Sequence, residues 1–382
     1  MHILFVSDVY FPRINGVSTS IQTFAHRFIA EGHRVTLIAP RYASELEDHF
    51  EILRIPSRYL PFDAEDRFMK ASAIRRLKQK IAESRPDIVH IQTPFVAHYA
   101  GLNLARALDL PVVETYHTYF EEYLENYLPF LPAPFLRFLA RRFSVSQCNS
   151  VDRVIVPSRP MAEVLKDYGI QSEAQVIPTG IPLANFTGGD GDSFRQQHQL
   201  PADRPVLLFV GRVAFEKNIG FLFQVMLALR DRVPDALLLI AGEGPACKAL
   251  ARQAQRLGLE QQVRFIGYLS RDGDLADCYA AADAFVFASR TETQGLVLLE
   301  AMAAGTPVIT TAVMGTADIM ADGRGGLVVK EDAQAFAGTV TGFLGDAELR
   351  QRLTREALAK AGDWSDAAMA RRQLELYAEL VG

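Results

Sequence analysis

The sequence predicts an α/β protein with two Rossmann-like domains, each built on a doubly wound parallel sheet, that face a central cleft. Three observations support this prediction. The length of 382 residues is long for one hydrophobic core and suits two. Short apolar segments alternate with amphipathic helical segments in both halves, which is typical of parallel α/β sheets. Two stretches rich in Pro and Gly, residues 178–182 and 188–192, read as a linker, so we expect domains at residues 1–185 and 186–365.

Short apolar runs in the first half predict its strands. The clearest helix between them is Ser18–Glu31, where Ile21, Phe24 and Phe28 share one face, Ser18 caps the start and Gly32 ends the helix. The predicted strands of this half are Ile3–Ser7, Arg34–Ala39, Ile88–Ile91, Val112–Thr115 and Arg153–Val156.

The second half repeats this alternation, with a helix after each apolar run. Ligands of such sheets bind beyond the carboxyl ends of the strands, so the residues that follow each strand are the candidates for a functional site. The predicted strands are Val206–Val210, Ala236–Ala241, Val263–Ile266, Ala284–Phe287 and Val308–Thr310.

The segment after the strand at 284–287 is the most informative. Glu292 lies in the loop before a predicted helix, Leu296–Ala304, and Glu300 lies inside that helix among apolar neighbours. A helix N-terminus suits a phosphate, and a carboxylate on a buried helix must be paired or bound to something. The two glutamates therefore predict a ligand with a diphosphate and hydroxyls, as in a sugar nucleotide. The alternative, two solvated surface charges, fits poorly with so apolar a helix.

Two cations follow the strand at 206–210. Arg212 offers a planar fork of donors and Lys217 a point charge, and both suit a diphosphate. Taken alone they could be solvated loop charges. Gly242 and Gly244 follow the next strand and could line the nucleotide site, but no G-x-G-x-x-G is present, which argues against a nicotinamide dinucleotide.

The first domain contributes two further candidates. The turn at Asn15-Gly16 precedes the helix that begins near Ser18, so backbone could approach a ligand there, although a plain turn is the alternative. His117 stands just after a predicted strand and could hydrogen-bond a sugar hydroxyl, although a lone His is usually structural. No Ser/His/Asp or Cys/His set suggests a covalent nucleophile.

Composition excludes several classes of function. A net charge of −5 and a pI near 6 make nucleic acid an unexpected partner. Cys148, Cys247 and Cys278 show neither disulfide nor zinc spacing. The sequence shows no signal peptide and no apolar run of membrane-spanning length, which favours a cytoplasmic location.

Residues 119–143 combine aromatic residues with arginines, a composition that suits a membrane interface. A core-packing helix with a charged outer face is the alternative, and Glu121, Glu122 and Glu125 count against strong binding to an anionic surface. The residues concerned are Tyr119, Phe120, Tyr123, Tyr127, Phe130, Phe135, Phe138 and Phe143 with Arg137, Arg141 and Arg142.

Together these motifs resemble those of the retaining glycosyltransferases of family 4, which have the GT-B fold, over essentially the whole chain. The resemblance rests on the E-x7-E element at Glu292 and Glu300, the loop from Gly211 to Asn218, Ala241 to Pro245, Gly305 to Ile309, and Asn15 to Val17. It implies an acceptor-binding first domain, a second domain that binds the nucleotide sugar, and a last helix, residues 366–382, that packs back on the first domain.

The resemblance also implies roles for individual residues, with neither cofactor nor metal required. Arg212 and Lys217 would hold the diphosphate, Glu300 the ribose, and Glu292 and His117 the transferred sugar. Donor contacts would further come from Gly16, Gly242, Gly267 and the run Thr293, Gln294, Gly295 and Leu296.

The donor and acceptor stay open at the level of the sequence. The segment Tyr116 to Tyr123 resembles bacterial diacylglycerol glucosyltransferases, which favours a lipid acceptor and a peripheral location on the inner face of the membrane. UDP-glucose and GDP-mannose types of donor remain alternatives. So do a soluble sugar acceptor, an epimerase-like enzyme of similar form and a non-catalytic sugar-nucleotide-binding protein, while a dehydrogenase is the most distant alternative.

Overall fold

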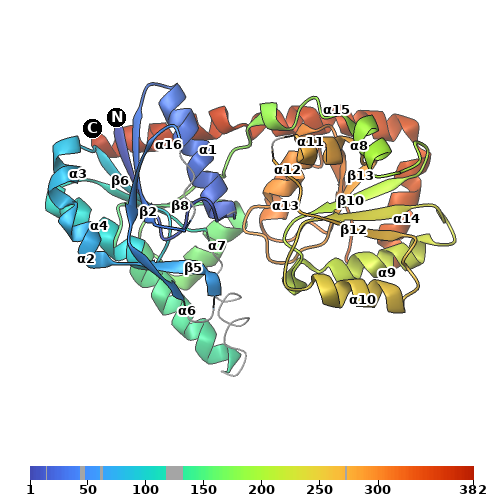
Figure 1. The fold of residues 1–382 in the computed structure, drawn as a ribbon, viewed down its shortest axis with the longest axis horizontal. Helices are drawn as coiled ribbons and strands as arrows, with labels where there is room; N and C mark the ends of the chain where they lie inside the picture. The colour runs from blue at the N-terminus through green and yellow to red at the C-terminus, as the bar shows by residue number, and fades with distance from the viewer. Residues whose placement is uncertain (14, 44–47, 61–62, 118–131, 272) are drawn as a thin grey trace. The chain divides into compact units, whose positions relative to one another are not determined.

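The computed structural model describes residues 1–13, 15–43, 48–60, 63–117, 132–271 and 273–382. The chain forms two compact units (Figure 1). Unit 1 comprises Met1–Gly180 and Asp366–Gly382, and unit 2 comprises Ile181–Ser365. Each unit has its own parallel sheet, so the prediction of two Rossmann-like domains is confirmed.

The sheet of unit 1 has the order β3-β2-β1-β6-β7-β8-β9 among the described residues, and all its pairings are parallel. Its central strands are continuous apolar runs because helices cover both faces of a parallel sheet. The strands are β1 His2–Val6, β2 Arg34–Pro40, β3 Glu51–Ile55, β6 Ile88–Ile91, β7 Val112–Thr115, β8 Arg153–Val156 and β9 Ala174–Val176.

Helices and one antiparallel ribbon complete unit 1. The ribbon pairs β4, Ser57–Leu60, with β5, Asp63–Met69. The helices are α1 Gly16–Ala30, α2 Ala71–Arg76, α3 Lys78–Ser84, α4 Val96–Leu108, α6 Ala133–Cys148, α7 Arg159–Tyr168 and α16 Asp366–Val381.

Helix α16 belongs to unit 1 although all of unit 2 precedes it in the chain. It packs along α1 (Figure 1), and Tyr377 is fully buried in the same core as Phe24 and Phe28. The Tyr377 hydroxyl hydrogen-bonds His90 Nδ1 on β6 at 2.5 Å. At the start of α16, Asp366 accepts hydrogen bonds from Arg27 Nε and Nη2 at 2.6 and 2.9 Å.

The sheet of unit 2 has the order β12-β11-β10-β13-β14-β15, again parallel throughout the described residues. Helices α9 and α10 lie on one face, and α8, α11 and α12 on the other (Figure 1). The strands are β10 Val206–Val210, β11 Leu237–Ala241, β12 Val263–Gly267, β13 Ala284–Phe287, β14 Val308–Thr310 and β15 Gly326–Val328. The helices are α8 Gly191–Gln197, α9 Ile219–Leu229, α10 Cys247–Arg256, α11 Asp274–Ala280, α12 Leu296–Ala303, α13 Gly315–Ile319, α14 Ala333–Gly345 and α15 Ala347–Asp363.

Two local predictions were wrong. Helix α1 is capped by Asn15 rather than Ser18: the Asn15 side chain accepts a hydrogen bond from Ser18 N at 2.8 Å, because Asn serves as well as Ser at this position. The stretch at 188–192 is part of unit 2 rather than a linker. A Cβ on Gly189 would lie 2.5 Å from Ala276 O, so this glycine permits close packing against α11.

Candidate active site

The topology of unit 2 creates a crevice position at the carboxyl ends of β10 and β13. The chain winds from β10 towards β12 in one direction and from β13 towards β15 in the other, so the two loops after β10 and β13 diverge there. Such a switch point is where open α/β sheets bind their ligands. The loop after β10 carries Arg212 and Lys217, and the loop after β13 carries Glu292.

Lys217 and Glu292 are in direct contact. Lys217 Nζ donates a hydrogen bond to Glu292 Oε1 at 2.6 Å, and each side chain is only 19% exposed. Arg212 lies in the same loop and is exposed. Asn218, with a positive φ of 55°, ties this loop to the end of β13 by donating from Nδ2 to Ala288 O at 3.1 Å. The structure thus brings together a cation and a carboxylate that lie 75 residues apart in the sequence.

Backbone contacts hold the loops after β10, β11 and β12 side by side. Gly242 N donates to Gly267 O at 2.7 Å, and Gly211 N donates to Ala241 O at 3.0 Å. A Cβ on Gly242 would lie 2.0 Å from Gly211 O, and the φ of Gly242 is +134°. Gly242 is therefore required for the packing of these loops, a reason that the sequence did not reveal.

The loop before α12 is held by a second close approach. Gly315 N donates to Glu292 O at 2.8 Å, and a Cβ on Gly315 would lie 2.3 Å from Thr293 O. Gln294 is buried, and Gly295 precedes the helix with a φ of +88°. The backbone N–H groups at Leu296 and after open the helix at the carboxyl edge of the sheet, where helix N-termini favour anions.

Glu300 is buried and engaged on both carboxylate oxygens. Tyr279 OH donates to Oε2 at 2.9 Å, and Arg271 Nη2 lies 3.1 Å from Oε1. Glu300 is 2% exposed, whereas the Arg271 side chain is 39% exposed. The negative charge of Glu300 raises the pKa of Arg271, and burial followed by that charge raises the pKa of Tyr279. Neither partner was predicted, since both pairings depend on how β12 and α11 meet α12.

Unit 1 has its own switch point, between β1 and β6. Asp8, just after β1, accepts hydrogen bonds from Thr93 Oγ1 at 3.0 Å and from Ala97 N at the start of α4 at 3.1 Å. Burial raises the pKa of Asp8 to about 7, although these hydrogen bonds lower it. Asp8 and Thr93 were not among the predicted residues, because no local motif marks them.

His117 and Gly16 lie near this switch point in the fold of unit 1. His117 Nε2 is hydrogen-bonded to Gln92 Oε1 at 2.9 Å, and burial lowers the pKa of His117 to about 4. The imidazole is therefore neutral near pH 7. Gly16 is the first residue of α1, and a Cβ there would meet nothing within 4 Å. The fold of unit 1 alone therefore gives no steric reason for a glycine at this position.

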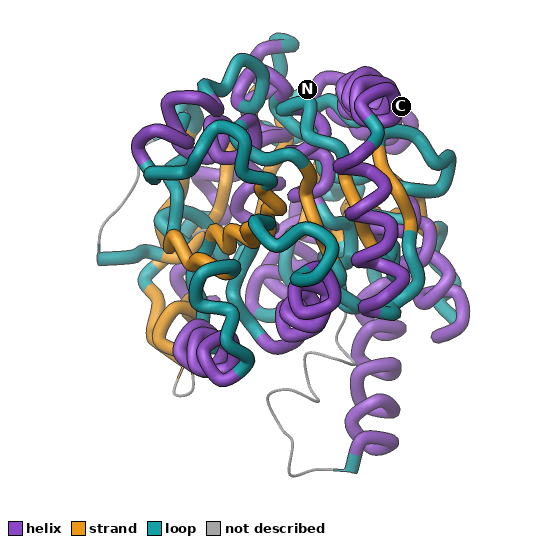
Figure 2. The backbone as a smooth tube through the Cα atoms, turned by 90° about the vertical axis from the view of Figure 1, so that its right-hand side faces the viewer, coloured by secondary structure: helices purple, strands orange, loops and turns teal. Residues whose placement is uncertain are grey.

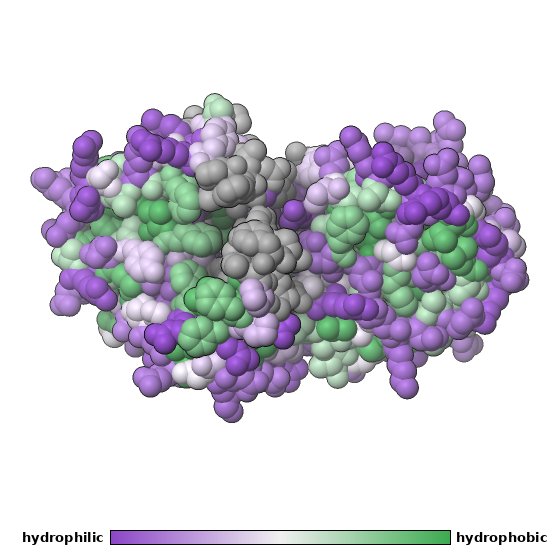
Figure 3. Space-filling view, turned by 90° about the horizontal axis from the view of Figure 1, so that it is seen from below, coloured by the Kyte–Doolittle hydropathy of each residue, from purple (hydrophilic) through white to green (hydrophobic). Residues whose placement is uncertain are grey.

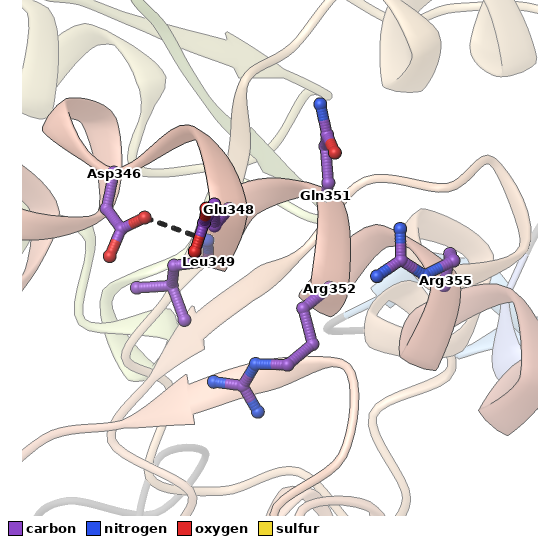
Figure 4. Close-up of a pocket in the computed structure, with 6 residues that line it drawn as sticks. All are labelled: Asp346, Glu348, Leu349, Gln351, Arg352 and Arg355. Carbon is purple, nitrogen blue, oxygen red and sulfur yellow. Dashed lines mark hydrogen bonds between the residues drawn. The ribbon is translucent and has the colours of Figure 1, made fainter.

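Neither a metal site nor the surface hollow at α15 gives further evidence about function. The described residues include no group of three or more His, Cys, Asp or Glu side chains arranged to hold a metal ion, and the expected absence of a metal stays a prediction. A surface hollow at the start of α15 (Figure 4) is lined by side chains of that helix and its cap residue, and none of the predicted site residues lines it. Its lining is Asp346, Glu348, Leu349, Gln351, Arg352 and Arg355.

Only part of the predicted membrane segment can be described. Residues 118–131, which include Tyr119, Phe120 and Tyr123, lie outside the described residues. The remainder opens α6, where Phe135 and Phe138 are 50% and 55% exposed. Within the described part of the chain, no helix has the length and apolar character to cross a bilayer.

Comparison with known proteins agrees with the family resemblance seen in the sequence. Residues 14–185 match the model of "Glycosyltransferase Family 4", and residues 190–360 match that of "Glycosyl transferases group 1". The chain is 34% identical to alpha-monoglucosyldiacylglycerol synthase of Streptococcus pneumoniae over 81% of this chain and 70% of that protein. It is 30% identical to a GDP-mannose-dependent alpha-mannosyltransferase of Mycolicibacterium smegmatis, over 87% and 85% of the two chains. The fold is similar to that of Anabaena HepE in complex with UDP, with a TM-score of 0.78, full coverage of both chains and 19% identity.

Proposed function

Because the chain belongs to glycosyltransferase family 4, has the GT-B fold and is a hexosyltransferase that uses nucleotide sugars, we propose that its acceptor is a membrane lipid. The donor is a UDP-glucose or GDP-mannose type of nucleotide sugar. The hexose moves to a lipid hydroxyl, such as that of diacylglycerol, at the inner face of the membrane.

One observation carries the donor half of the proposal: the contact between Lys217 and Glu292 at the switch point of unit 2. A cation beside a carboxylate, next to a helix N-terminus, offers one group for each end of a sugar diphosphate. Lys217 and Arg212 take the diphosphate, and Glu292 takes hydroxyls of the sugar. These are charge-assisted hydrogen bonds, and such bonds are stronger than neutral ones.

Charge stabilisation is the main contribution of these residues to the chemistry. When the bond from the anomeric carbon to the diphosphate breaks, negative charge grows on the departing oxygens. Arg212, Lys217 and the N-terminus of α12 favour that charge, and preorganised donors of this kind lower the barrier. In the front-face route expected for a retaining enzyme, a departing diphosphate oxygen accepts the proton of the acceptor hydroxyl.

The lipid half rests on the relative with 34% identity, whose name specifies a glucosylated diacylglycerol, and on the exposed aromatic and basic start of α6. GDP-mannose dependence in the second relative keeps both donor classes in the test.

A matrix of donors and acceptors tests the proposal. UDP-glucose, UDP-galactose and GDP-mannose, each labelled in the sugar, are incubated with diacylglycerol, phosphatidylinositol or a soluble sugar in detergent micelles. We expect label in a lipid product from one donor, with release of the free nucleoside diphosphate. Transfer only to the soluble sugar would refute the lipid acceptor, and conversion of the donor without transfer would indicate an epimerase-like enzyme.

A further inference from the structure

Exposed aromatic side chains are concentrated in unit 1. Among the described residues of unit 2, the exposed aromatic side chains are those of Phe215 and Tyr268. Unit 1 exposes Tyr59, Phe68, Phe95, Tyr99, Phe135 and Phe138, and these come from the β4–β5 ribbon, the start of α4 and the start of α6. Large aromatic side chains left exposed to water on these elements indicate a surface that binds something.

Five residues of the ribbon and α4 form what we call the ribbon patch: Arg58, Phe68, Lys70, Phe95 and Tyr99. Arg58 and Phe68 are cross-strand partners, so their side chains leave the same face of the ribbon. Lys70 follows two residues after Phe68. The Phe68 ring packs edge-on against the Phe95 ring, with 6.3 Å between centroids. Tyr99 lies one helical turn after Phe95 and is 57% exposed.

Basic residues outnumber acidic residues in the chain around this patch. The stretches 57–59, 67–76, 95–103 and 132–142 contain no Asp or Glu, in a protein whose net charge is −5. Their cations are Arg58, Arg67, Lys70, Arg75, Arg76, Arg137, Arg141 and Arg142. Three acidic residues, Asp63, Glu65 and Asp66, lie between the first two of these stretches in the sequence and offset part of the positive charge. The aromatic side chains must therefore supply part of any binding at this surface.

The ribbon patch and the start of α6 lie towards the same side of unit 1. Figure 1 places β5 and α6 in the lower half of this unit, and Figure 2 shows α6 extending below the rest of it. Viewed from that side, Figure 3 shows hydrophobic side chains on the surface of unit 1, and it shows others on unit 2. On α6, Phe135, Phe138 and Leu139 share a face, and Arg142 lies over the Phe138 ring at 5.8 Å.

We propose that the ribbon patch is a second membrane contact of this protein, which acts beside α6 and binds the headgroup region of a bilayer that contains anionic phospholipid. The inference rests on the lipid acceptor proposed above and deepens it. Aromatic rings lie favourably at headgroup depth, while Arg and Lys bury their apolar stems and reach the lipid phosphates. Two separate membrane contacts, the ribbon patch and the start of α6, would fix the orientation of unit 1 on the bilayer surface. A single helix would not.

Vesicle flotation tests this contact. Unilamellar vesicles of phosphatidylcholine with or without phosphatidylglycerol are mixed with the wild-type protein, with Phe68→Ser/Tyr99→Ser or with Arg58→Gln/Lys70→Gln. We expect the aromatic double variant to partition at least about tenfold more weakly to both kinds of vesicle, and the charge variant to lose only the gain given by phosphatidylglycerol. Partitioning of the aromatic variant within twofold of wild type would overturn the inference.

Two controls separate this outcome from misfolding and from failure of the proposed function. Val328→Ser/Leu358→Ser removes matched exposed side chains from unit 2 and should float like the wild type, while Phe68→Tyr/Tyr99→Phe keeps the rings and should retain binding. All variants are also assayed with a short-chain diacylglycerol in detergent. If the aromatic double variant transfers sugar in detergent but floats weakly, the ribbon patch is supported. If it transfers sugar and floats like the wild type, the ribbon patch is refuted. If no protein, wild type included, transfers sugar to any lipid, only the proposed acceptor is refuted.

Discussion

Lys217 and Glu292 form a hydrogen-bonded ion pair, although we assign them to different parts of the donor. Lys217→Ala should lower kcat/KM by about 10²- to 10³-fold, the usual effect of losing a group that stabilises developing charge. Glu292→Ala should mainly lower kcat. The two losses should not multiply in the double variant, because residues in contact couple.

Unfolding in urea gives the control for this pair. We expect a coupling energy of about 0.5 to 3 kcal/mol between Lys217 and Glu292, as both are mostly buried. Arg352 and Glu356 form an i,i+4 pair on α15 whose arginine is 57% exposed, and they should couple by only about 0.3 to 0.5 kcal/mol. Full transferase activity of both Lys217→Ala and Glu292→Ala would refute the assignment of these two residues to the donor site.

Arg271 is a positioning residue for Glu300 in our interpretation. Arg271→Gln should weaken UDP or GDP binding about tenfold and change kcat little, since a buried carboxylate that loses its cation is no longer held in place. Arg271→Lys should recover part of the affinity. Isothermal titration with the nucleoside diphosphate measures this, and an unchanged affinity for Arg271→Gln would contradict the role.

His117 makes stability depend on pH in a direction that can be worked out. Its folded-state pKa of about 4 lies below the ordinary value of 6.5, so the unfolded chain takes up a proton first as the pH falls. The free energy of unfolding should therefore be unaffected by this group above pH 6.5 and should decrease between pH 6.5 and about 4.

Comparison with His117→Gln isolates that contribution. Between pH 7 and pH 5, the wild type should lose about 1 to 2 kcal/mol more unfolding free energy than His117→Gln, because one pKa unit corresponds to about 1.4 kcal/mol. Equal losses in the two proteins, or an NMR titration of His117 near pH 6.5, would contradict the pKa.

At the scale of elements, the sequence predicts the interior strands well but misses three of the four edge strands of the two large sheets in the described part of the chain. Strands β6, β7, β8, β10, β13 and β14 have the predicted bounds, because strands buried on both faces are continuous apolar runs. Strands β3, β9 and β15 were missed, and each lies at the edge of its sheet, where fewer neighbours demand apolar residues. The β4–β5 ribbon was missed for the same reason.

The site follows the same division. Lys217, Glu292 and Glu300 stand out because charged residues follow or interrupt apolar runs. Arg271, Tyr279 and Asp8 do not stand out, since their partners come from other strands and helices and only the strand order brings them together.

Glycines at loop contacts and in helices should respond oppositely to substitution. Gly242→Ala should destabilise unit 2 by at least about 2 kcal/mol, because its Cβ would collide with Gly211 O and its φ is strained for alanine. Gly342→Ala on α14, where a Cβ meets nothing, should stabilise by about 0.5 to 1 kcal/mol. The fluorescence of Trp364, the one tryptophan of the sequence, reports unfolding of unit 2. A neutral Gly242→Ala would contradict the loop packing.

For the whole molecule, α16 makes unit 1 depend on residues that come after unit 2. Tyr377→Ala should cost unit 1 about 3 to 5 kcal/mol, as expected for a large buried ring. Arg371→Ala, at an exposed position of the same helix, should change stability by less than about 0.5 kcal/mol. Hydrogen exchange of unit 1 peptides measures both. If unit 1 peptides of Tyr377→Ala were as protected from hydrogen exchange as those of the wild type, unit 1 would be stable without this contact.

The return of α16 also sets an order of events during synthesis. A ribosome makes the sheet of unit 1 first, yet α1 lacks its contacts with α16, including that of Phe28 with Tyr377, until residues 366–381 leave the exit tunnel. Unit 2 is continuous in sequence and can close its core earlier. The unit synthesised first is thus the last to be completed, and a nascent chain stalled before Asp366 presents chaperones with apolar side chains that α16 buries in the finished protein.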